Sequence, residues 1–371
     1  MSNAKVYFTT FRTTPEINIL QKLNRLIIKA GIKEINLEKQ YVAIKLHLGE
    51  PGNIAYLRPN FSKVVADLVK ELGGKPFLTD SNTLYVGRRK DGLEHLEAAY
   101  ENGYNPFCTG CHVIIADGIK GNDEISIPVE GGEYIKEAKI GRAIMDADVI
   151  ISLTHFKGHE CSGFGGAIKN IGMGSGSRAG KMEMHSSGKP EVQQENCIGC
   201  TKCTKVCAQE AIKIKEKKAK IDIEKCVGCG RCLAICPVDA IEPLWGQSND
   251  IMCKKMAEYT KAVLQGKEHF HISIIMDVSP YCDCHCENDA AIIPNIGILA
   301  SKDPVALDQA CADLVIKAPV ISQTYLDEQI RKGIKEKDHF HTMHPDTHWQ
   351  TTLEHSEKLG IGTRKYDLIE I

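Results

Sequence analysis

Two four-cysteine runs with the same spacing constrain this 371-residue chain more than any other feature. The runs span residues 197–207 and 226–236, and each has the pattern C-x₂-C-x₂-C-x₃-C. Bacterial proteins that hold [4Fe–4S] clusters use this pattern, in which three nearby thiolates bind one cluster and the fourth ligand comes from elsewhere. The second run repeats the first after 29 residues, from Cys197 to Cys226. The sequence therefore predicts two [4Fe–4S] clusters as cofactors.

The fourth cysteine of each run is predicted to bind the cluster of the other run. Zinc sites use two separate C-x₂-C pairs, so two full runs favour clusters over zinc knuckles, and disulfides are favoured still less. Gly199, Gly228 and Gly230 allow backbone N–H groups to approach the cluster sulfurs. We expect one cluster on Cys197, Cys200, Cys203 and Cys236, and the other on Cys226, Cys229, Cys232 and Cys207.

Composition and charge exclude several classes of protein. The chain is 43% hydrophobic and 25% charged, as globular proteins are, and is long enough for two or three domains. A net charge of −2 gives no support to a nucleic-acid or anionic-membrane partner. No apolar run approaches the ~18 residues that span a bilayer, and the N-terminus lacks the signal-peptide pattern. We therefore expect a cytoplasmic protein with no membrane span, in a reducing compartment.

Strand-like and helical patterns alternate on both sides of the cysteine runs. This alternation predicts an α/β fold, with a mostly parallel sheet and helices on both faces. The cysteine runs interrupt it as an inserted α+β domain at residues 190–245, leaving 1–189 and 246–371 as the two parts of the α/β domain. Strands are expected at residues 6–10, 41–46, 76–80, 113–116, 147–153, 271–277, 292–299 and 366–371, with a small hairpin over 212–223. Helices are expected at residues 15–30, 61–72, 93–102, 139–145, 251–264, 304–316, 323–332 and 350–359.

A glycine-rich segment follows the predicted strand at residues 147–153, and so leaves the carboxyl edge of the sheet. Open α/β sheets bind ligands at this edge, and eight glycines between Gly158 and Gly180 would let backbone N–H groups approach an anion. The segment matches neither nucleotide-binding motif. We favour an anion-binding loop over a plain glycine-rich connection. The candidate catalytic residues are His155, Lys157, His159, Lys169 and, after an earlier strand, His47; the candidate ligand-binding residues are Lys45, Asn170, Arg178 and Lys181.

Three further cysteines, Cys282, Cys284 and Cys286, follow a predicted strand. Alternate positions of an extended segment point the same way, so these three thiols are candidate ligands of a further metal. Reversible redox chemistry is a second interpretation, and inert buried thiols are a third. For Cys108 and Cys111 we favour the inert interpretation.

Five motifs together resemble a bacterial and archaeal family, the iron–sulfur-centre proteins of domain of unknown function 362. They lie at residues 45–53, 155–159, 163–170, 178–181 and 303–308, so the resemblance covers nearly the whole chain. Residues 197–237 separately resemble the two-cluster bacterial ferredoxin module, which some members carry as an insertion. The departure is Ala208, which stands where the second run has Pro237. The resemblance implies cluster binding and implies no particular reaction.

The leading hypothesis is an iron–sulfur oxidoreductase in which the clusters feed electrons to an anionic small molecule at the glycine-rich segment. His155 or His159 would deliver protons, while Lys157 and Lys169 would bind the anionic group. The alternative is an electron carrier or scaffold that docks a redox partner protein and performs no chemistry of its own. A third hypothesis is a metal-dependent enzyme that uses residues 282–286.

Overall fold

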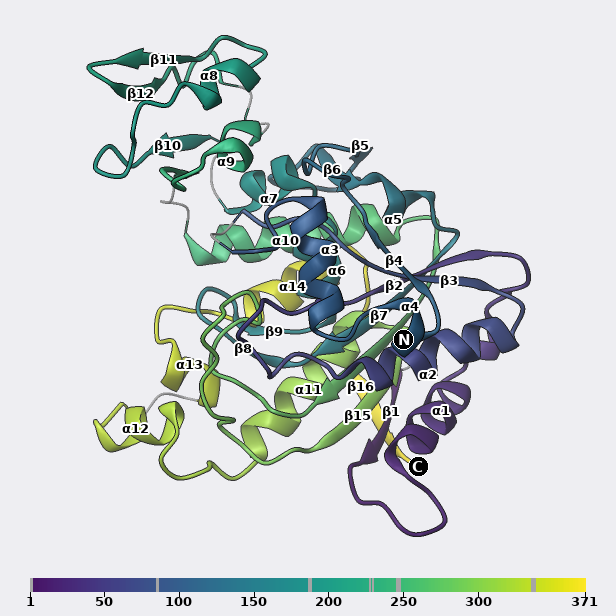
Figure 1. Cartoon of the computed structure of the whole chain (residues 1–371). Helices are drawn as coiled ribbons and strands as arrows, with labels where there is room; N and C mark the ends of the chain where they lie inside the picture. Colours follow the sequence, from purple (N-terminus) through teal and green to yellow (C-terminus); the bar gives the residue numbers. More distant parts are fainter. Residues whose placement is uncertain are drawn as a thin grey trace.

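An eight-stranded sheet forms the centre of the computed structural model, which describes residues 3–84, 87–185, 189–226, 228, 230–244, 248–334 and 338–371 (Figure 1). The strand order is β16-β1-β15-β14-β7-β2-β3-β4, and β15 alone runs antiparallel to its neighbours. The predicted α/β fold with a mostly parallel sheet is therefore confirmed. The strands are β1 (Ala4–Thr10), β2 (Tyr41–Lys45), β3 (Lys75–Asp80), β4 (His112–Ile115), β7 (Val149–His155), β14 (Glu268–Ile275), β15 (Gly297–Ser301) and β16 (Tyr366–Glu370).

Helices cover both faces of this sheet. Successive side chains of a strand point to opposite faces, and along β2 Val42 and Ile44 join one core while Ala43 joins another. The first core packs against α1 (Ile19–Lys29) and α2 (Pro59–Glu71). On the other face lie α6 (Ala167–Ser175), α10 (Asn249–Leu264) and α11 (Pro304–Lys317).

The remaining elements of the α/β part are short and connect or flank the sheet. β5 and β6 form an antiparallel hairpin, as do β8 and β9. Among the described residues, no helix combines the length and apolar character needed to cross a membrane. These elements are η1 (Ile32–Glu34), α3 (Gly92–Glu101), α4 (Pro106–Thr109), β5 (Glu124–Pro128), β6 (Glu137–Gly141), α5 (Arg142–Asp146), β8 (Lys157–His159), β9 (Gly163–Gly165), α7 (Arg178–His185), α12 (Tyr325–Arg331), α13 (His339–Met343) and α14 (Gln350–Lys358).

Residues 189–244 form a separate lobe, called the cysteine lobe below, at the upper left of Figure 1. β10 pairs with β13 and β11 with β12, each antiparallel, and the predicted hairpin over 212–223 is confirmed. Each cysteine run contains a short helix, and the two helices contact each other. The elements are β10 (Pro190–Val192), α8 (Lys202–Val206), β11 (Ile212–Lys215), β12 (Lys218–Ile221), α9 (Arg231–Ile235) and β13 (Ile241–Pro243).

Three predicted elements are wrong in extent or type. The first helix begins at Ile19 rather than residue 15, because Asn18 caps it and Gln21 completes a capping box. The helix expected at 139–145 is instead the end of β6 followed by α5. The strand expected at 292–299 begins only at Gly297, where pairing with β1 and β14 starts.

The predicted glycine-rich loop is also wrong, because much of it is helical. Residues 167–175 form α6 and residues 178–185 form α7. A Cβ at Gly172 would lie 2.1 Å from the carbonyl oxygen of Met256, so this glycine lets α6 pack closely on α10. A Cβ at Gly174 would lie 2.4 Å from Lys45 Nζ. These two glycines therefore serve close packing inside a helix rather than an open anion-binding loop.

Candidate functional site

Four neighbouring parallel strands, β14, β7, β2 and β3, end at one edge of the sheet, and the segments that follow them enclose a cavity. This is the edge at which open α/β sheets bind ligands. The cavity, called the basic cavity below, has a volume of about 50 Å³, which suits a small ion better than a large cofactor. It is lined by Lys45, His47, Asp80, Ser81, Thr83, Arg89, Lys157, His159, Lys169, Asn170, Met173, Gly174, Lys181, His185, Met252 and Cys284.

Seven of the nine predicted catalytic and ligand-binding residues line this cavity, and His155 and Arg178 do not. His155 is buried behind it, with Nδ1 2.9 Å from Asp283 Oδ2 and Nε2 2.8 Å from the carbonyl oxygen of Met276. Arg178 points away from the cavity and donates to the carbonyl oxygen of Lys120 at 2.8 Å. Both residues can therefore influence the cavity only through other groups.

The helix α6 places Lys169 and Asn170 in the cavity, and a distant carboxylate fixes where this helix begins. Asp308 of α11 accepts hydrogen bonds from the backbone N–H groups of Ala167 and Ile168, at 2.7 and 3.0 Å. Burial raises the pKa of Asp308 to about 7. Asn170 then links β2 and β7, because its Nδ2 donates to the carbonyl oxygen of Lys45 and to Thr154 Oγ1, each at 3.0 Å.

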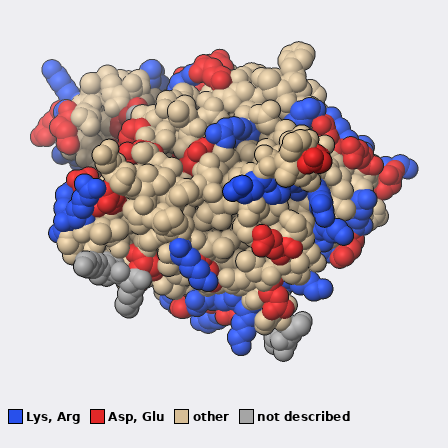
Figure 2. Space-filling view, turned by 90° about the horizontal axis from the view of Figure 1, so that it is seen from below, with Lys and Arg blue, Asp and Glu red and all other residues tan. Residues whose placement is uncertain are grey.

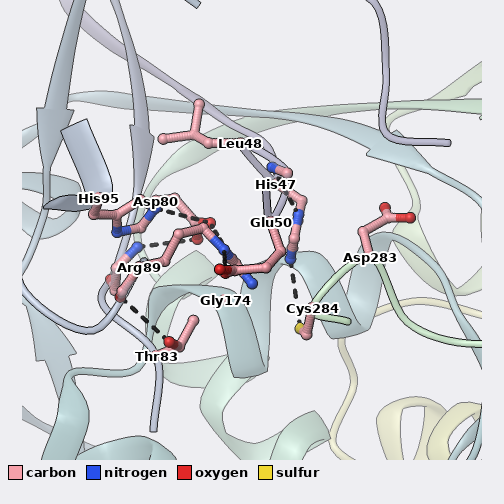
Figure 3. A network of polar contacts seen from close by, with 12 residues as sticks. His47, Leu48, Glu50, Asp80, Thr83, Arg89, His95, Gly174, Asp283 and Cys284 are labelled. Atoms are coloured by element: carbon pink, nitrogen blue, oxygen red, sulfur yellow. Dashed lines mark hydrogen bonds and ion pairs between the residues drawn. The ribbon is translucent and has the colours of Figure 1, made fainter. Parts of the chain in front are cut away.

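Three cations of the cavity are paired with buried carboxylates. Lys45 Nζ lies 2.9 Å from Asp80, Arg89 Nε lies 2.8 Å from Glu50, and Lys157 Nζ lies 3.2 Å from Asp283. Burial opposes ionisation of Asp80, yet the charge of Lys45 holds its pKa well below the usual range. Figure 3 shows Arg89 among Asp80, Glu50 and Thr83.

Two other cations, Lys169 and Lys181, have no carboxylate oxygen within salt-bridge distance in the described part of the chain. Lys181 Nζ donates to the carbonyl oxygen of Gly176 at 2.6 Å, and burial lowers its pKa to about 8. Lys169 Nζ lies 3.1 Å from Cys282 Sγ. On the face drawn in Figure 2, by contrast, acidic and basic side chains are interspersed. Lys169 and Lys181 are thus buried cations of the cavity that no carboxylate of the described residues contacts directly.

Two histidines present N–H groups toward the cavity. Nδ1 of His47 accepts a hydrogen bond from the N–H of Gly49 at 3.1 Å. Nδ1 of His159 accepts from the N–H groups of Cys161 and Ser162, at 3.0 and 3.1 Å. A ring nitrogen that accepts carries no proton, so in both residues Nε2 holds it. Both histidines line the cavity as N–H donors.

The segment at residues 282–286 is a turn, so the predicted extended arrangement is wrong. The N–H of His285 donates to the carbonyl oxygen of Cys282 at 3.1 Å, which closes the turn. The turn brings Cys282 Sγ within 2.9 Å of Cys284 Sγ, while Cys286 is exposed and contacts Glu287. A hydrogen bond from Cys284 and the charge of Lys169 hold the pKa of Cys282 well below its usual range, although burial opposes them.

Two groups of side chains have the composition and proximity of metal ligands. The ligand atoms of His47, Cys282 and Cys284 lie within 4.8 Å of one another. The same holds for His159, Glu160 and Cys161, which lie beside the cavity. Cysteine and histidine are common ligands of zinc and related ions. The chain therefore has candidate metal sites outside its two cysteine runs.

Two cavities in the cysteine lobe are lined by the cysteines of both runs. Cys197, Cys200 and Cys203 line one cavity together with Cys236. The other is lined by Cys207 of the first run and by Cys226 and Cys232 of the second, while Cys229 lies outside the described residues. Each predicted set combines three cysteines of one run with the fourth cysteine of the other run. The seven described cysteines are grouped around the two cavities in this way.

Backbone N–H groups donate to the sulfurs of the first and last cysteines of both runs. The N–H groups of Ala211 and Ala240, each four residues after a run's last cysteine, donate to Cys207 and Cys236 at 3.3 and 3.2 Å. The first cysteine of each run also accepts a hydrogen bond. The N–H of Ala219 donates to Cys197 Sγ at 3.3 Å, and the N–H of Gly228 donates to Cys226 Sγ at 3.4 Å.

Helix α7 separates the basic cavity from the cysteine lobe. Lys181 and His185 line the cavity. Met182 packs with cysteines of the lobe, and a Cβ at Gly230 would lie 2.9 Å from Arg178 Cγ and 3.2 Å from Met182 Cε. A single helix, with a thickness on the order of 10 Å, therefore has one side in the cavity and another against the lobe.

Sequence reasoning missed Arg89 as a cavity residue. It is 1% exposed and pairs with Glu50, whereas its neighbour Arg88 pairs with exposed carboxylates. Nothing in the local sequence separates these two arginines, because both follow a glycine in a turn. Asp80, by contrast, directly ends a predicted strand, and the sequence therefore predicts its position at the same edge of the sheet.

Fold and site define an α/β protein with a buried basic cavity at the carboxyl edge of its sheet and a small lobe rich in cysteine. Residues 42–313 match the family described as domain of unknown function (DUF362), and the chain belongs to this family. It is also similar to a thylakoid-associated protein of Synechocystis sp., with 30% identity over 127 residues. That match covers 33% of this chain and 34% of the relative, so the chain spans about a third of the relative's length.

Two solved structures are similar at 11% identity. The lactate racemase apoprotein from Thermoanaerobacterium thermosaccharolyticum has a TM-score of 0.39, with 99% of this chain and 83% of that chain covered. A Thermotoga maritima protein has a TM-score of 0.36, with 69% and 50% covered. These scores bear on neither the site nor its chemistry.

Proposed function

We propose that this protein is an iron–sulfur oxidoreductase, in which two [4Fe–4S] clusters in the cysteine lobe supply electrons to a small anion in the basic cavity. The observation that carries this proposal is the position of α7, whose Lys181 and His185 line the cavity while Met182 packs on the lobe. Electron transfer through protein weakens steeply with distance. A separation of about one helix thickness therefore favours a link between the two sites.

The cysteine lobe fits two clusters in its ligands and in its hydrogen bonds. One set would be Cys197, Cys200, Cys203 and Cys236, and the other Cys207, Cys226, Cys229 and Cys232. Four thiolate positions accept backbone N–H groups, as cluster ligands commonly do to tune their potential. When bound, each cluster supplies or accepts one electron.

The basic cavity fits a small anion because two of its cations are buried without a carboxylate. Burying an uncompensated charge is costly, so Lys181 is expected to gain its counter-charge from a ligand, while Lys169 lies 3.1 Å from Cys282 Sγ and can contact the same ligand from the cavity wall. In the proposed mechanism these two lysines bind the anion, and His159 Nε2–H donates a hydrogen bond to it. His155 acts as a positioning residue, because it holds Asp283, which in turn holds Lys157.

Electrons would arrive from a reduced redox partner protein in the cytoplasm. The side of the lobe near the first cysteine run favours such docking, because Cys200 is exposed and its neighbour Ile198 is 63% exposed. An exposed apolar side chain beside a cluster ligand would let a partner approach closely.

The test is anion binding to anaerobically prepared, cluster-loaded protein, with phosphate, sulfate and oxalate as probes in titration calorimetry. Charge-assisted hydrogen bonds contribute about 1.5–3 kcal/mol, so Lys181→Met should weaken binding roughly 10- to 100-fold. The exposed Lys33→Met variant is the matched control and should bind as the wild type does. Failure of all three anions to bind, with unchanged electron transfer to a redox protein in Lys181→Met, would favour the electron-carrier alternative.

A further inference from the structure

We propose that Cys282 and Cys284 form a redox-active pair at the wall of the basic cavity, which cycles between a dithiol and a disulfide. This inference deepens the proposed function and rests on it for the source of electrons. Cys284 lines the cavity, and Cys282 lies directly behind it. The pair would be the two-electron store nearest to the bound anion.

The turn at residues 282–285 favours a bond between these two sulfurs. A disulfide requires Cα atoms of the two cysteines about 4.4–6.8 Å apart, and a closed turn holds residues i and i+2 nearer than an extended chain does. The sulfurs already lie 2.9 Å apart, within hydrogen-bond contact. Cys286 is exposed, contacts Glu287 instead, and thus provides a control thiol in the same segment.

Hydrogen-bond donors surround both sulfurs, which favours a reactive thiolate. Lys169 Nζ lies 3.1 Å from Cys282 Sγ, and the N–H of Cys284 lies 3.4 Å from it. Nε2 of His47, the nitrogen that carries the proton, lies 3.5 Å from Cys284 Sγ (Figure 3). Nearby cations and N–H donors stabilise the thiolate, and the thiolate is the reactive species in disulfide formation and exchange. Cys282 is therefore the thiolate and Cys284 the thiol.

The same contacts argue against a metal ion on this pair. A metal needs a free lone pair on Nε2 of His47, yet Gly49 donates to Nδ1 and leaves the proton on Nε2. The ammonium group of Lys169 would also repel a cation at Cys282. A dithiol pair needs no change in the tautomer of His47 and no displacement of Lys169. The geometry therefore favours a dithiol pair over a metal ion at Cys282 and Cys284.

The proposed step balances in electrons and protons. The Cys282 thiolate and the Cys284 thiol form one S–S bond and release two electrons and one proton. The electrons leave singly to two one-electron acceptors of the iron–sulfur class, for which the proposed clusters qualify, and the proton leaves through the cavity that Cys284 lines. The reverse step takes up two electrons and one proton. The pair would thus couple one-electron carriers to a two-electron reaction of the anion.

The test uses anaerobically purified, cluster-loaded protein equilibrated with reduced and oxidised dithiothreitol over a range of ratios. Thiols are then trapped with N-ethylmaleimide, and the peptide that contains residues 282–286 is measured by mass spectrometry. We expect Cys282 and Cys284 to lose the label together, with the peptide lighter by two hydrogen atoms and Cys286 still labelled. Labelling of both residues at every ratio, or a disulfide that includes Cys286, would overturn the proposal.

Two variants and an elemental analysis separate this inference from other outcomes. Cys284→Ser should abolish the disulfide and leave Cys282 open to the label, whereas Cys286→Ser should preserve it. A stoichiometric metal that protects both thiols until a chelator is added would overturn the dithiol in favour of a metal site. If the disulfide forms in protein that lacks acid-labile sulfide, the proposed clusters are contradicted and the cysteine pair is not. If clusters are present and no disulfide forms, the proposed cysteine pair is contradicted and the clusters are not.

Discussion

The basic cavity and the cysteine lobe are stabilised in different ways. The cavity lies at the edge of an eight-stranded sheet with large apolar cores on both faces, so its cations are held by a scaffold that exists without any ligand. The lobe has only two-stranded sheets and short helices, and its buried cluster includes Cys197, Cys203 and Cys232 beside small aliphatic side chains. Small domains with weak cores usually depend on metals or disulfides. We therefore expect the stability of the lobe to depend on the binding of a metal group to its thiols, and that of the cavity to depend on the sheet.

The largest expected effect follows from removing one cluster ligand. Two clusters hold about eight irons per chain, and Cys203→Ser should lower this to roughly four, because one complete ligand set is lost. Iron analysis and electron paramagnetic resonance of the reduced protein measure the change. The control is Cys108→Ser, an exposed thiol outside both runs, which should keep the full iron content.

Hydrogen exchange on the same variant sharpens the comparison. We expect amides of the lobe to lose protection, while those of β7 and β14 keep it. Loss of protection throughout the sheet would contradict the independence of the two regions.

A second effect distinguishes paired from unpaired cations in the cavity. Lys45→Met leaves Asp80 without its nearest partner, and breaking a buried pair in this way costs about 3–5 kcal/mol. Lys181→Met removes a buried charge that has no carboxylate partner, so the free energy of unfolding should stay the same or rise. Chemical denaturation of both variants measures this. Equal destabilisation by the two substitutions would show that Lys181 is a structural lysine.

A third effect concerns the close packing that positions α6. In Gly172→Ala the new Cβ would meet a backbone oxygen of α10, and such overpacking costs up to about 3 kcal/mol. Because α6 carries Lys169 and Asn170, anion binding should weaken as well. Gly176→Ala is the matched control, since the closest atom to its Cβ would be the terminal methyl of Met184 at 2.7 Å, which can move, and the nearest backbone atom would lie 3.4 Å away. Calorimetric melting and phosphate titration follow the two changes.

The smallest effect is a difference in acid sensitivity between the regions. Burial lowers the pKa of His95 to about 3, against the opposing charge of Asp80, so the folded protein keeps this ring neutral. The unfolded chain binds the proton near its usual pKa of about 6.5. Stability from this group is therefore present above pH 6.5 and is lost as the pH falls toward 3.

Between pH 7 and 5 this loss amounts to about 2 kcal/mol for one histidine. His95→Gln should therefore lose less stability than the wild type over this range, as urea unfolding would measure. Residues 189–244 contain no histidine, so the lobe should not share this sensitivity. Identical acid profiles for variant and wild type would contradict the assignment.

The parallel sheet and the edge that carries the cavity could be predicted from the sequence, because both follow from local periodicity and from the alternation of strands and helices. Seven of nine proposed site residues line the cavity for the same reason, since they end a buried strand or lie in the segment after one. The turn at Cys282 and the burial of Arg89 depend on contacts between distant segments, which periodicity does not encode. The glycines of α6 misled the prediction, because their role is contact with α10 rather than backbone freedom.

The central claim is that the two cysteine-lined cavities hold iron–sulfur clusters which serve the basic cavity across α7. Iron, zinc and acid-labile sulfide, measured per chain in protein purified without oxygen, test it most directly. We predict about eight irons and about eight sulfides, with no stoichiometric zinc. One or two zinc ions per chain without sulfide would contradict the claim.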